Sequence, residues 1–374
     1  MIRKPIRSFL EFYILFILCY TMKGVSMKKK RILSIYLLVL IIAGLISVPI
    51  WKQLEKTTSI AFSEKKRTVK VPTLKIIDEK SDSRPVAVMI NNHNYARKNH
   101  SGLQDAFVIY EMIVEGGITR LMAIYKDKET DRIGSVRSSR HNFLDYASEY
   151  DAIYVHFGWS NLAKKDISSF GINNINGLYD NKGFWRDKSL KVPIEHTAFT
   201  NIERIIEVAK EKEYSLTTEK KIPLHYQVYP ISLEKKEDAI KADKIVLRYS
   251  NYMTTSYTYD AENKVYKRYA NDVEHVDAIT KEQYQFKNII VMKVKNYSVD
   301  SYERQNLDTV GTGEGYYITN GYARKIKWTK ESRTGDTIYT YETGEEVLLN
   351  DGNTFIQVQP ISEKTIIEGV SSDS

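Results

Sequence analysis

Four arginines have the type and the placement that could support chemistry. They lie where chain elements are expected to begin or end, at Arg120, Arg137, Arg140 and Arg186. A guanidinium donates two parallel hydrogen bonds to a phosphate or a carboxylate, and the start of a helix adds unpaired N–H groups and the positive end of a dipole. Because residues at element ends can converge on one point, the stretch Glu115 to Arg140 predicts an anion-binding site.

The same arginines also have a simpler interpretation, in which each one pairs with a nearby carboxylate and pins a turn. The candidate partners are Asp105, Glu111, Glu115 and Asp145. Both interpretations stay open, because the spacing along the chain does not show which arginines keep hydrogen-bond donors for a ligand.

Candidate supporting residues for an anion site are Glu115, His156, Asp187 and His196. A histidine near the end of a strand, such as His93 or His156, can serve as a base, although it is more often a structural residue. Glu111 and Glu115 could form an acid/base pair, but their separation cannot be read from the sequence. No catalytic residue is assigned.

The spacing of ligand residues does not indicate metal or cofactor chemistry. The chain contains seven histidines and one cysteine, with no HExxH pattern and no CxxC pair. The glycine-rich stretch Gly311 to Gly315 lacks the lysine-serine/threonine end and the following helix of a phosphate loop. We therefore expect no metal and no cofactor, and we expect a mobile hairpin at this stretch.

The formal charge of +8 is concentrated at the N-terminal end of the 374 residues. Residues 1–70 hold 14 lysines and arginines against three glutamates, a balance of +11, so the rest of the chain carries −3. A nucleic-acid binder needs its positive field on the folded body. We therefore expect no nucleic-acid partner.

The N-terminal charge flanks a segment that could cross a membrane. Ile32 to Ile50 contains no charged residue and is long enough for a helical span. The basic run Lys28 to Arg31 precedes it and orients that end toward the cytoplasm. These features predict a single-pass anchor in the cell membrane with both folded domains outside the cytoplasm. A cleaved signal peptide is the alternative, but the ending SVPIWK is a poor cleavage site.

The residues before this span leave the start of the protein open. Residues 1–31 are expected to form a cytoplasmic N-terminus. Met27 begins a well-formed basic and apolar signal, so residues 1–26 are interpreted as an upstream extension, and a two-span hairpin is the alternative. Cys19 lacks the small preceding residue that lipidation requires, and a single cysteine allows no internal disulfide. Residues 51–83 are polar and lysine-rich and are expected to form a linker.

Residues 84–225 are expected to form a mixed α/β domain, because continuous apolar runs alternate with helical patterns. The expected strands are 86–90, 107–114, 118–125 and 152–157, and the expected helices are 139–150 and 202–212.

Residues 226–374 are rich in Tyr, Thr and Val and are interrupted by turns, which predicts a mostly β domain. The expected strands are 244–250, 256–259, 265–269, 288–295, 315–319, 323–328, 337–341 and 354–358. The predicted fold class is therefore α+β, with a mixed α/β N-terminal domain and a mostly β C-terminal domain, preceded by a transmembrane helix.

Seven segments carry a family resemblance. They are RPVAVMINNH (84–93), EGGITR (115–120), GSVRSSR (134–140), YDAIYVHFG (150–158), FWRDKS (184–189), KWTKESR (327–333) and FIQVQP (355–360). Over roughly residues 70–362 the chain resembles the YerB-like family of uncharacterised Gram-positive extracytoplasmic lipoproteins. The resemblance implies a two-domain α+β protein outside the membrane with no established activity. This chain lacks the lipidated cysteine of the pattern, so a helix anchor would replace the lipid.

The order of parts also resembles that of LytR-CpsA-Psr wall-polymer transferases, in which arginines hold a polyprenyl pyrophosphate, although the motifs of those enzymes are absent. Two hypotheses follow. The first is a membrane-anchored envelope protein of unknown activity that binds an anionic small ligand or a protein partner through the arginines. The second is a cell-envelope enzyme that acts on a phosphorylated or lipid-linked wall precursor. A pure scaffold is a third class.

Overall fold

The computed structural model describes residues 72–369 and a few positions between 26 and 53. The chain divides into two units, Met1–Val71 and Pro72–Ser374. The expected span at 32–50 lies largely outside the described residues, as do the expected N-terminal segment 1–31 and most of the linker. Within the described part, no helix is both long enough and apolar enough to cross a bilayer.

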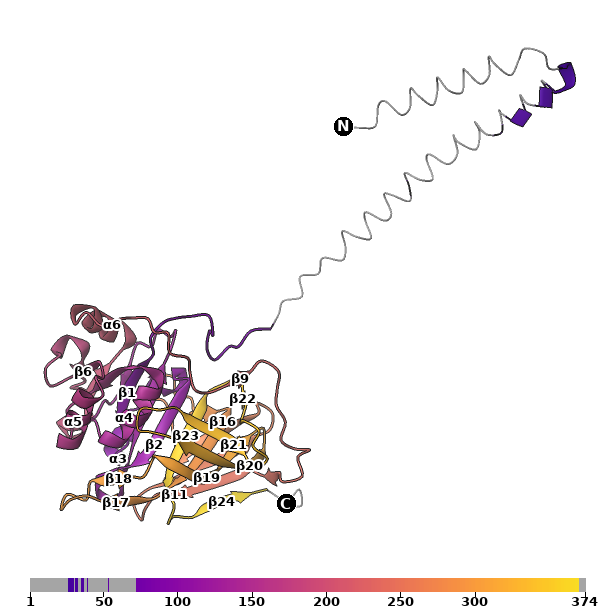
Figure 1. The fold of residues 1–374 in the computed structure, drawn as a ribbon. Coiled ribbons are helices and arrows are strands. Elements are labelled where there is room, and N and C mark those ends of the chain that lie inside the picture. Colours follow the sequence, from indigo (N-terminus) through magenta and orange to yellow (C-terminus); the bar gives the residue numbers. More distant parts are fainter. Residues whose placement is uncertain are drawn as a thin grey trace. The chain divides into compact units, whose positions relative to one another are not determined.

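The second unit contains an eleven-stranded mixed sheet that takes strands from both halves of the chain (Figure 1). Its order is β10-β20-β19-β16-β23-β2-β3-β1-β5-β6, and β21 pairs with β20. The first-half strands are β1 (Val86–Asn91), β2 (Val108–Ile113), β3 (Thr119–Tyr125), β5 (Ile153–His156) and β6 (Asn174–Asn176). The second-half strands are β10 (Ile240–Lys241), β16 (Asn288–Val294), β19 (Gly311–Thr319), β20 (Tyr322–Lys330), β21 (Thr337–Tyr341) and β23 (Thr354–Pro360).

The two halves of this sheet meet at β23. This late strand lies between β2 and β16 and is parallel to both, so residues at the C-terminal end pair directly with a strand of the first half. Such pairing between distant segments ties the two halves into one hydrogen-bonded layer.

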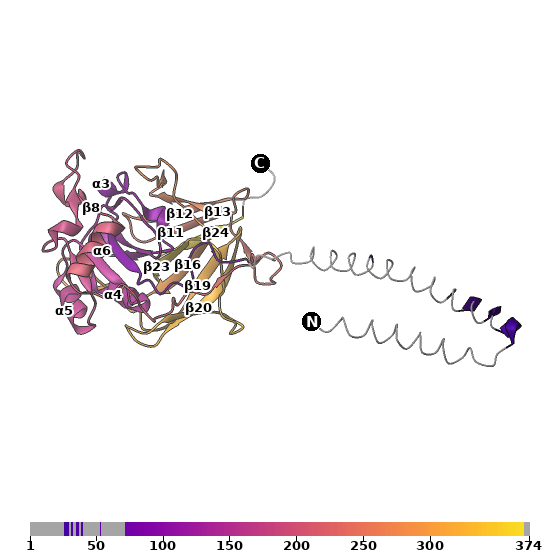
Figure 2. The same cartoon turned by 90° about the horizontal axis from the view of Figure 1, so that it is seen from above.

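A second sheet packs against one face of the first, as the view from above shows (Figure 2). Its order is β14-β13-β12-β11-β24, with β15 paired to β13. The bounds are β11 (Lys244–Arg248), β12 (Thr254–Asp260), β13 (Val265–Ala270), β14 (Val273–Glu274), β15 (Gln285–Phe286) and β24 (Thr365–Glu368). Smaller sheets are formed by β4 (Ile133–Gly134), β7 (Trp185–Arg186) and β8 (Ala198–Thr200), by β9 (Tyr226–Gln227) and β22 (Leu349–Asn350), and by β17 (Asn296–Ser298) and β18 (Gln305–Leu307).

The helices are short and belong to the first half of the chain. They are α3 (Asn94–Arg97), α4 (His141–Ala147), α5 (Asn161–Ser169) and α6 (Ile202–Glu211), with single 3-10 turns η1 (Leu103–Asp105), η2 (Glu115–Gly117), η3 (Ser148–Tyr150), η4 (Asn181–Gly183) and η5 (Ile194–His196). The side-chain oxygen of Asn201 accepts from the N–H of Arg204 at 2.9 Å and caps α6.

The core has two parts because alternate residues of a strand point to opposite faces. On β1, Val86, Val88 and Ile90 join a cluster that includes Ile245 and Leu247 of the second sheet. Ala87 and Met89 face the other way and join a cluster that includes Phe143 and Leu144 of α4. The main sheet is therefore covered on both faces, which is why its strands read as continuous apolar runs.

The mixed α/β first half and the mostly β second half are confirmed. The glycine-rich stretch does belong to a hairpin, because Gly311–Thr319 is strand β19, paired antiparallel with β20 along its whole length. Gly315 is required there, since a Cβ at this position would lie 1.9 Å from the carbonyl oxygen of Val291. The glycine permits close approach of two backbones.

Candidate anion-binding site

Arg120 and Arg140 both bind the carboxylate of Glu115. Arg140 donates from Nε to Oε2 at 2.7 Å and from Nη2 to Oε1, and Arg120 donates from Nη2 to Oε1 at 3.2 Å. Arg120 is 3% exposed, and its Nη1 also donates to the carbonyl oxygen of Ser138 at 2.6 Å. This Glu115 clamp joins η2, the start of β3 and the segment before α4. It is the pairing that the simpler interpretation of the arginines predicted.

The clamp holds two guanidiniums around one carboxylate, and this arrangement shifts the pKa values of Glu115 and Arg120. Burial acts to raise the pKa of Glu115, but Arg120 and Arg140 outweigh burial and hold this pKa at about 2. Desolvation and the neighbouring Arg140 lower the pKa of Arg120 to about 9. At neutral pH the three groups are ionised, so the clamp carries one net positive charge.

Acid should remove the stability that the clamp provides. The folded pKa of Glu115, about 2, lies below its ordinary value of 4.5, so its contribution is present above about pH 5 and is lost as the pH falls through about 2. The contribution at pH 7 is about 3 kcal/mol. We expect Glu115→Gln to lower the free energy of unfolding at pH 7 by about 2–3 kcal/mol, and by less than half of that at pH 3.

Chemical denaturation at the two pH values measures this difference, and Glu237→Gln provides the control, because Glu237 is an exposed glutamate. An equal loss of stability at pH 7 and pH 3 would contradict the assigned pKa shift of Glu115.

Arg137 and Arg186 both contact η5, and their partners differ from those of the clamp arginines. Arg137 donates from Nη1 to the carbonyl oxygen of Glu195 at 3.2 Å, and Arg186 donates from Nη1 to the carbonyl oxygen of Ile194. The Arg186 guanidinium also lies 4.6 Å from the ring centre of Phe157. Within residues 72–369 neither guanidinium forms an ion pair or uses its Nε and Nη2 groups in a hydrogen bond. Both side chains are half-buried, so these groups remain for a ligand.

The charges of the Glu115 clamp and of the pair Arg137 and Arg186 influence one another. Desolvation is the main cause of the lowered pKa of Arg137, and both Arg140 and Arg186 lower it further, whereas Glu195 and Glu115 raise it. The structure therefore brings all four sequence-predicted arginines together as two groups, the clamp and the pair around η5. Binding of a ligand by these arginines stays a prediction.

The start of α4 contributes little to this neighbourhood. The helix has only seven residues, and Arg140 occupies its N-cap without a capping hydrogen bond from its side chain. A helix this short has a weak dipole, so the expected contribution of a helix N-terminus is absent here.

Two histidines stack beside Arg137. The rings of His93 and His196 lie 5.0 Å apart with planes 21° from parallel. Desolvation is the main cause of the lowered pKa of both rings. Arg97 and then Arg137 lower the pKa of His93 further, and His93 and then Arg137 lower the pKa of His196 further. His196 is one of the residues that the sequence proposed as support, and it belongs to η5 together with Glu195.

Hydrogen bonds fix which nitrogen of each ring carries the hydrogen. The Oδ1 atom of Asn91 accepts from the backbone N–H of His93 at 3.2 Å, so the Asn91 amide nitrogen faces Nδ1 of His196, at 2.7 Å. That Nδ1 must accept, and the hydrogen of neutral His196 is therefore on Nε2. In His93, Nδ1 accepts from the backbone N–H of Tyr95 at 3.3 Å, which also leaves the hydrogen on Nε2. Desolvation lowers the pKa of both rings, which favours their neutral forms.

We call Arg137, Arg186, His93 and His196 the donor cluster. Each member already uses one atom in a contact that fixes its position, and each retains at least one N–H group. A cluster that offers only donors is suited to a ligand that offers only acceptors, such as a phosphate or a carboxylate.

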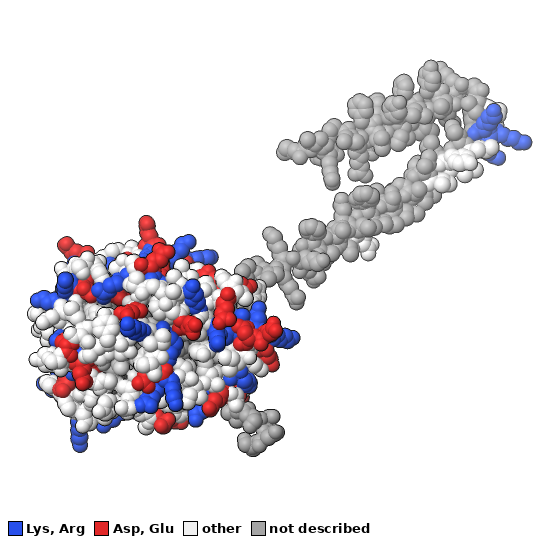
Figure 3. Space-filling view, turned by 60° about the horizontal axis from the view of Figure 1, so that its bottom comes forward, with Lys and Arg blue, Asp and Glu red and all other residues white. Residues whose placement is uncertain are grey.

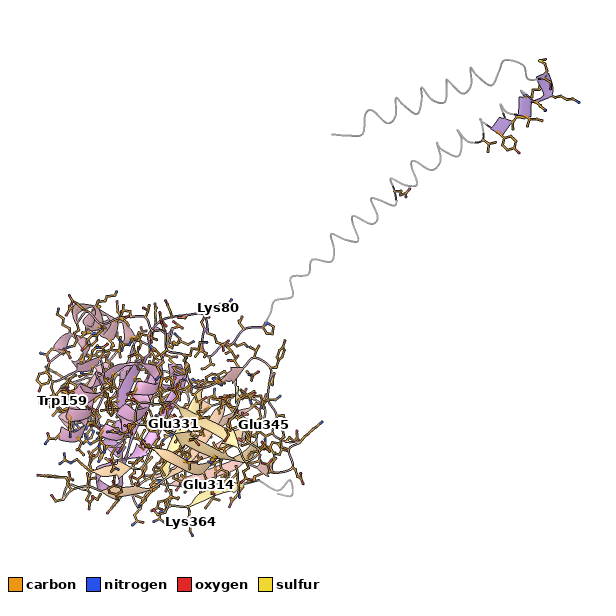
Figure 4. The ribbon with its side chains drawn as sticks, viewed as in Figure 1. Lys80, Trp159, Glu314, Glu331, Glu345 and Lys364 are labelled. Atoms are coloured by element: carbon orange, nitrogen blue, oxygen red, sulfur yellow. The ribbon has the colours of Figure 1, made fainter. Side chains whose placement is uncertain are left out.

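The other proposed supporting residues make their contacts elsewhere. His156 is fully buried, and its ring nitrogens lie 2.7 Å from the Gly158 carbonyl oxygen and 3.2 Å from Oδ1 of Asn174, which joins β5 to β6. Asp187 pairs with Arg132 at 2.9 Å. Trp159, at the outer side of the first half (Figure 4), stacks against His156 with ring centres 5.3 Å apart.

Sequence reasoning missed the role of Asn91. Its amide holds His196, and its neighbour His93 completes the stacked pair. The available signal was the polar run Asn91-Asn92-His93 directly after a buried strand. Nothing local indicated that η5, about a hundred residues later, would fold back against it.

The surface carries no broad basic region on the face shown in Figure 3, where acidic and basic side chains are interspersed. The positive character of the donor cluster is thus a local property of a few half-buried side chains, in agreement with the balance of −3 in the chain after residue 70.

Two family models match the chain. The model described as "Protein of unknown function (DUF3048) N-terminal domain" matches residues 73–215, and the model of the corresponding C-terminal domain matches residues 245–356. The first contains every residue of the donor cluster and of the Glu115 clamp.

A relative and a solved structure agree with these matches. The chain is 29% identical over 307 residues to YerB of Bacillus subtilis strain 168, a protein whose name describes it as a candidate lipoprotein, and the match covers 82% of this chain and 90% of the relative. The crystal structure of the Bacillus subtilis YerB protein superposes with a TM-score of 0.68 at 28% identity, covering 80% of this chain and 99% of that one. The chain belongs to the YerB-like family, a two-domain family of unknown function.

Proposed function

We propose that this protein is a membrane-associated protein of the cell envelope, with its folded body outside the cytoplasm, that binds a small anionic ligand through the donor cluster. The proposal rests on the observation that the free polar groups of the donor cluster are hydrogen-bond donors. Two guanidiniums without carboxylate partners donate to carbonyl oxygens of η5, and two stacked histidine rings, one of them in η5, add further N–H donors.

The charge of the cluster favours an anion with more than one negative oxygen. The clamp beside it contributes one net positive charge, and the exposed Glu195 offsets only one of the charges on Arg137 and Arg186. A phosphate or a pyrophosphate group matches this balance.

The location rests on two supports. The relative in Bacillus subtilis is named as a candidate lipoprotein, which suggests membrane association outside the cytoplasm. The uncharged run Ile32 to Ile50, with Lys28 to Arg31 before it, would serve as a single-pass helical anchor in place of a lipid.

Binding of the full-length chain to inorganic pyrophosphate, measured by titration calorimetry, tests the proposal. Charge-assisted hydrogen bonds contribute about 1.5–3 kcal/mol each, so Arg137→Gln and Arg186→Gln should each weaken binding about 10- to 100-fold. Lys164→Gln is the matched control, because Lys164 is an exposed cation that lies over Trp159. We expect this variant to bind like the wild type.

Two outcomes would contradict the proposal. Absence of saturable pyrophosphate binding to the folded wild type is one, and equal weakening by Lys164→Gln and Arg137→Gln is the other. A turnover assay on lipid-linked wall precursors tests the alternative hypothesis that the protein is a cell-envelope enzyme. Turnover by the wild type that Arg137→Gln removes would make the donor cluster part of an active site.

A further inference from the structure

A cavity of about 370 Å³ lies between the α3 segment and the end of the second sheet. Its lining residues come from three stretches: Asn94, Arg97 and Lys98; Ala270 and Asn271; and Val273, Glu274, His275, Val276, Asp277, Ala278 and Lys281. None of these residues belongs to the donor cluster or to the Glu115 clamp. The volume is at the lower end of the range for small-molecule sites and is equivalent to roughly a dozen water molecules.

Arg97 is a half-buried cation in this cavity that lacks a carboxylate partner. In the described part of the chain the only hydrogen bond of its guanidinium runs from Nη1 to the sulfur of Met253, at 3.0 Å. Desolvation and the positive charge of Arg268 lower its pKa, and Glu111 raises it. Glu111, however, is already bound by Arg268 at 3.0 Å, with both side chains fully buried. The region behind the cavity therefore holds two guanidiniums and one carboxylate.

The wall also carries two carboxylates, Glu274 and Asp277, and within residues 72–369 neither of them forms an ion pair with Arg97. Asp277 is buried, and its oxygens accept from the Tyr284 hydroxyl and from the N–H groups of Gly102 and Ile279, each at 2.8 Å. Much of the remaining wall is apolar and is formed by side chains of Ala270, Val273, Val276 and Ala278.

We propose that this cavity binds a small monocarboxylate with an apolar body, whose carboxylate pairs with Arg97. A planar guanidinium offers two parallel N–H groups that match the two oxygens of a carboxylate. The charged lining residues are Arg97, Lys98 and Lys281 against Glu274 and Asp277, which leaves one net positive charge and fits one carboxylate. The apolar walls fit a short hydrocarbon body. A phosphate would place further charged oxygens against these walls, where burial without partners costs free energy.

Saturation-transfer NMR of the full-length chain with hexanoate as the probe tests this site, since the method detects weak ligands. We expect saturable binding of hexanoate and at least fivefold weaker binding of hexan-1-ol. Arg97→Gln should weaken hexanoate binding at least tenfold, and Lys98→Gln, which removes a neighbouring exposed cation of the same cavity, should change it less than twofold. Val276→Phe fills the cavity while leaving Arg97 in place, and it should abolish binding. This variant keeps the test valid if Arg97→Gln fails to fold.

Three results would overturn the proposal: no saturable hexanoate binding to the folded wild type, equal binding by Arg97→Gln and Lys98→Gln, or displacement of hexanoate by an equal concentration of inorganic phosphate. The donor cluster is tested separately, because Arg137→Gln should leave hexanoate binding unchanged. Loss of hexanoate binding in that variant would also count against a separate site.

Discussion

Replacing Arg268 by methionine is expected to lower the free energy of unfolding by about 3–5 kcal/mol, because the change leaves a buried carboxylate without its cation. Arg268 and Glu111 are both 0% exposed, and Nη2 of the arginine lies 3.0 Å from Oε2 of the glutamate. Without Arg268, Glu111 keeps only neutral donors, from Asn92, Thr119 and Thr255. Neutral donors do not offset the desolvation of a full charge.

This pair also supports the donor cluster through a chain of hydrogen bonds. Arg268 donates to Nδ1 of His275 at 2.6 Å, so His275 donates from Nε2 to Nδ1 of His100 at 2.8 Å, and His100 donates to the carbonyl oxygen of Asn91 at 2.6 Å. Asn91 is the residue whose amide holds His196. The loss of Arg268 therefore loosens the strand end that positions the stacked histidines.

Urea denaturation of Arg268→Met and of the double variant Glu111→Gln, Arg268→Met measures the effect. Removal of both charges should cost less than the sum of the two single changes, as expected for groups that interact directly. A free energy of unfolding of Arg268→Met within 1 kcal/mol of the wild-type value would contradict the predicted cost of leaving Glu111 without its cation.

Replacing Lys330 by methionine is expected to cost about 3 kcal/mol, for a related reason. Lys330, the last residue of β20, is 0% exposed and pairs with Glu149 of η3, which is 1% exposed. The remaining partner of Glu149 would be the Thr337 hydroxyl, at 2.6 Å. Burial already raises the pKa of Glu149 and outweighs the opposing effect of Lys330.

The pH dependence distinguishes this pair from a packing defect. Without Lys330 the pKa of Glu149 rises further, so at pH 5 the carboxyl group is protonated at little cost and the variant should lose less stability than at pH 8. Thr337→Val removes only a neutral donor and should cost about 1 kcal/mol at both pH values. A loss from Lys330→Met that does not change with pH would contradict the assigned role of Glu149.

The local elements of the first half were predictable because its buried strands are continuous apolar runs. Val86 to Ile90 was expected and β1 is Val86–Asn91. The position of β23 was not predictable, since a strand at the C-terminal end pairs with β2 more than two hundred residues earlier. The need for glycine at position 315 was not predictable for the same reason, since its close neighbour, the Val291 carbonyl oxygen, belongs to another strand.

The site shows the same limit. Glu115 is a candidate supporting residue and a candidate ion-pair partner from the sequence, and in the structure it binds Arg120 and Arg140. The free donors of Arg137 and Arg186 depend on how η5 folds back. The hydrogen position on His196 depends on one amide, that of Asn91. These are tertiary facts with no local signature in the sequence.

The position of a bound anion tests the central claim most directly. Crystals of the protein grown with tungstate, a strong anomalous scatterer that resembles phosphate, should show one peak within hydrogen-bond distance, roughly 3 Å, of nitrogens from both Arg137 and Arg186. The Nε2 atoms of His93 and His196 should face the same peak. Separate peaks at the two arginines with none shared, or an ordered anion only at other places, would show that these donors do not form one site.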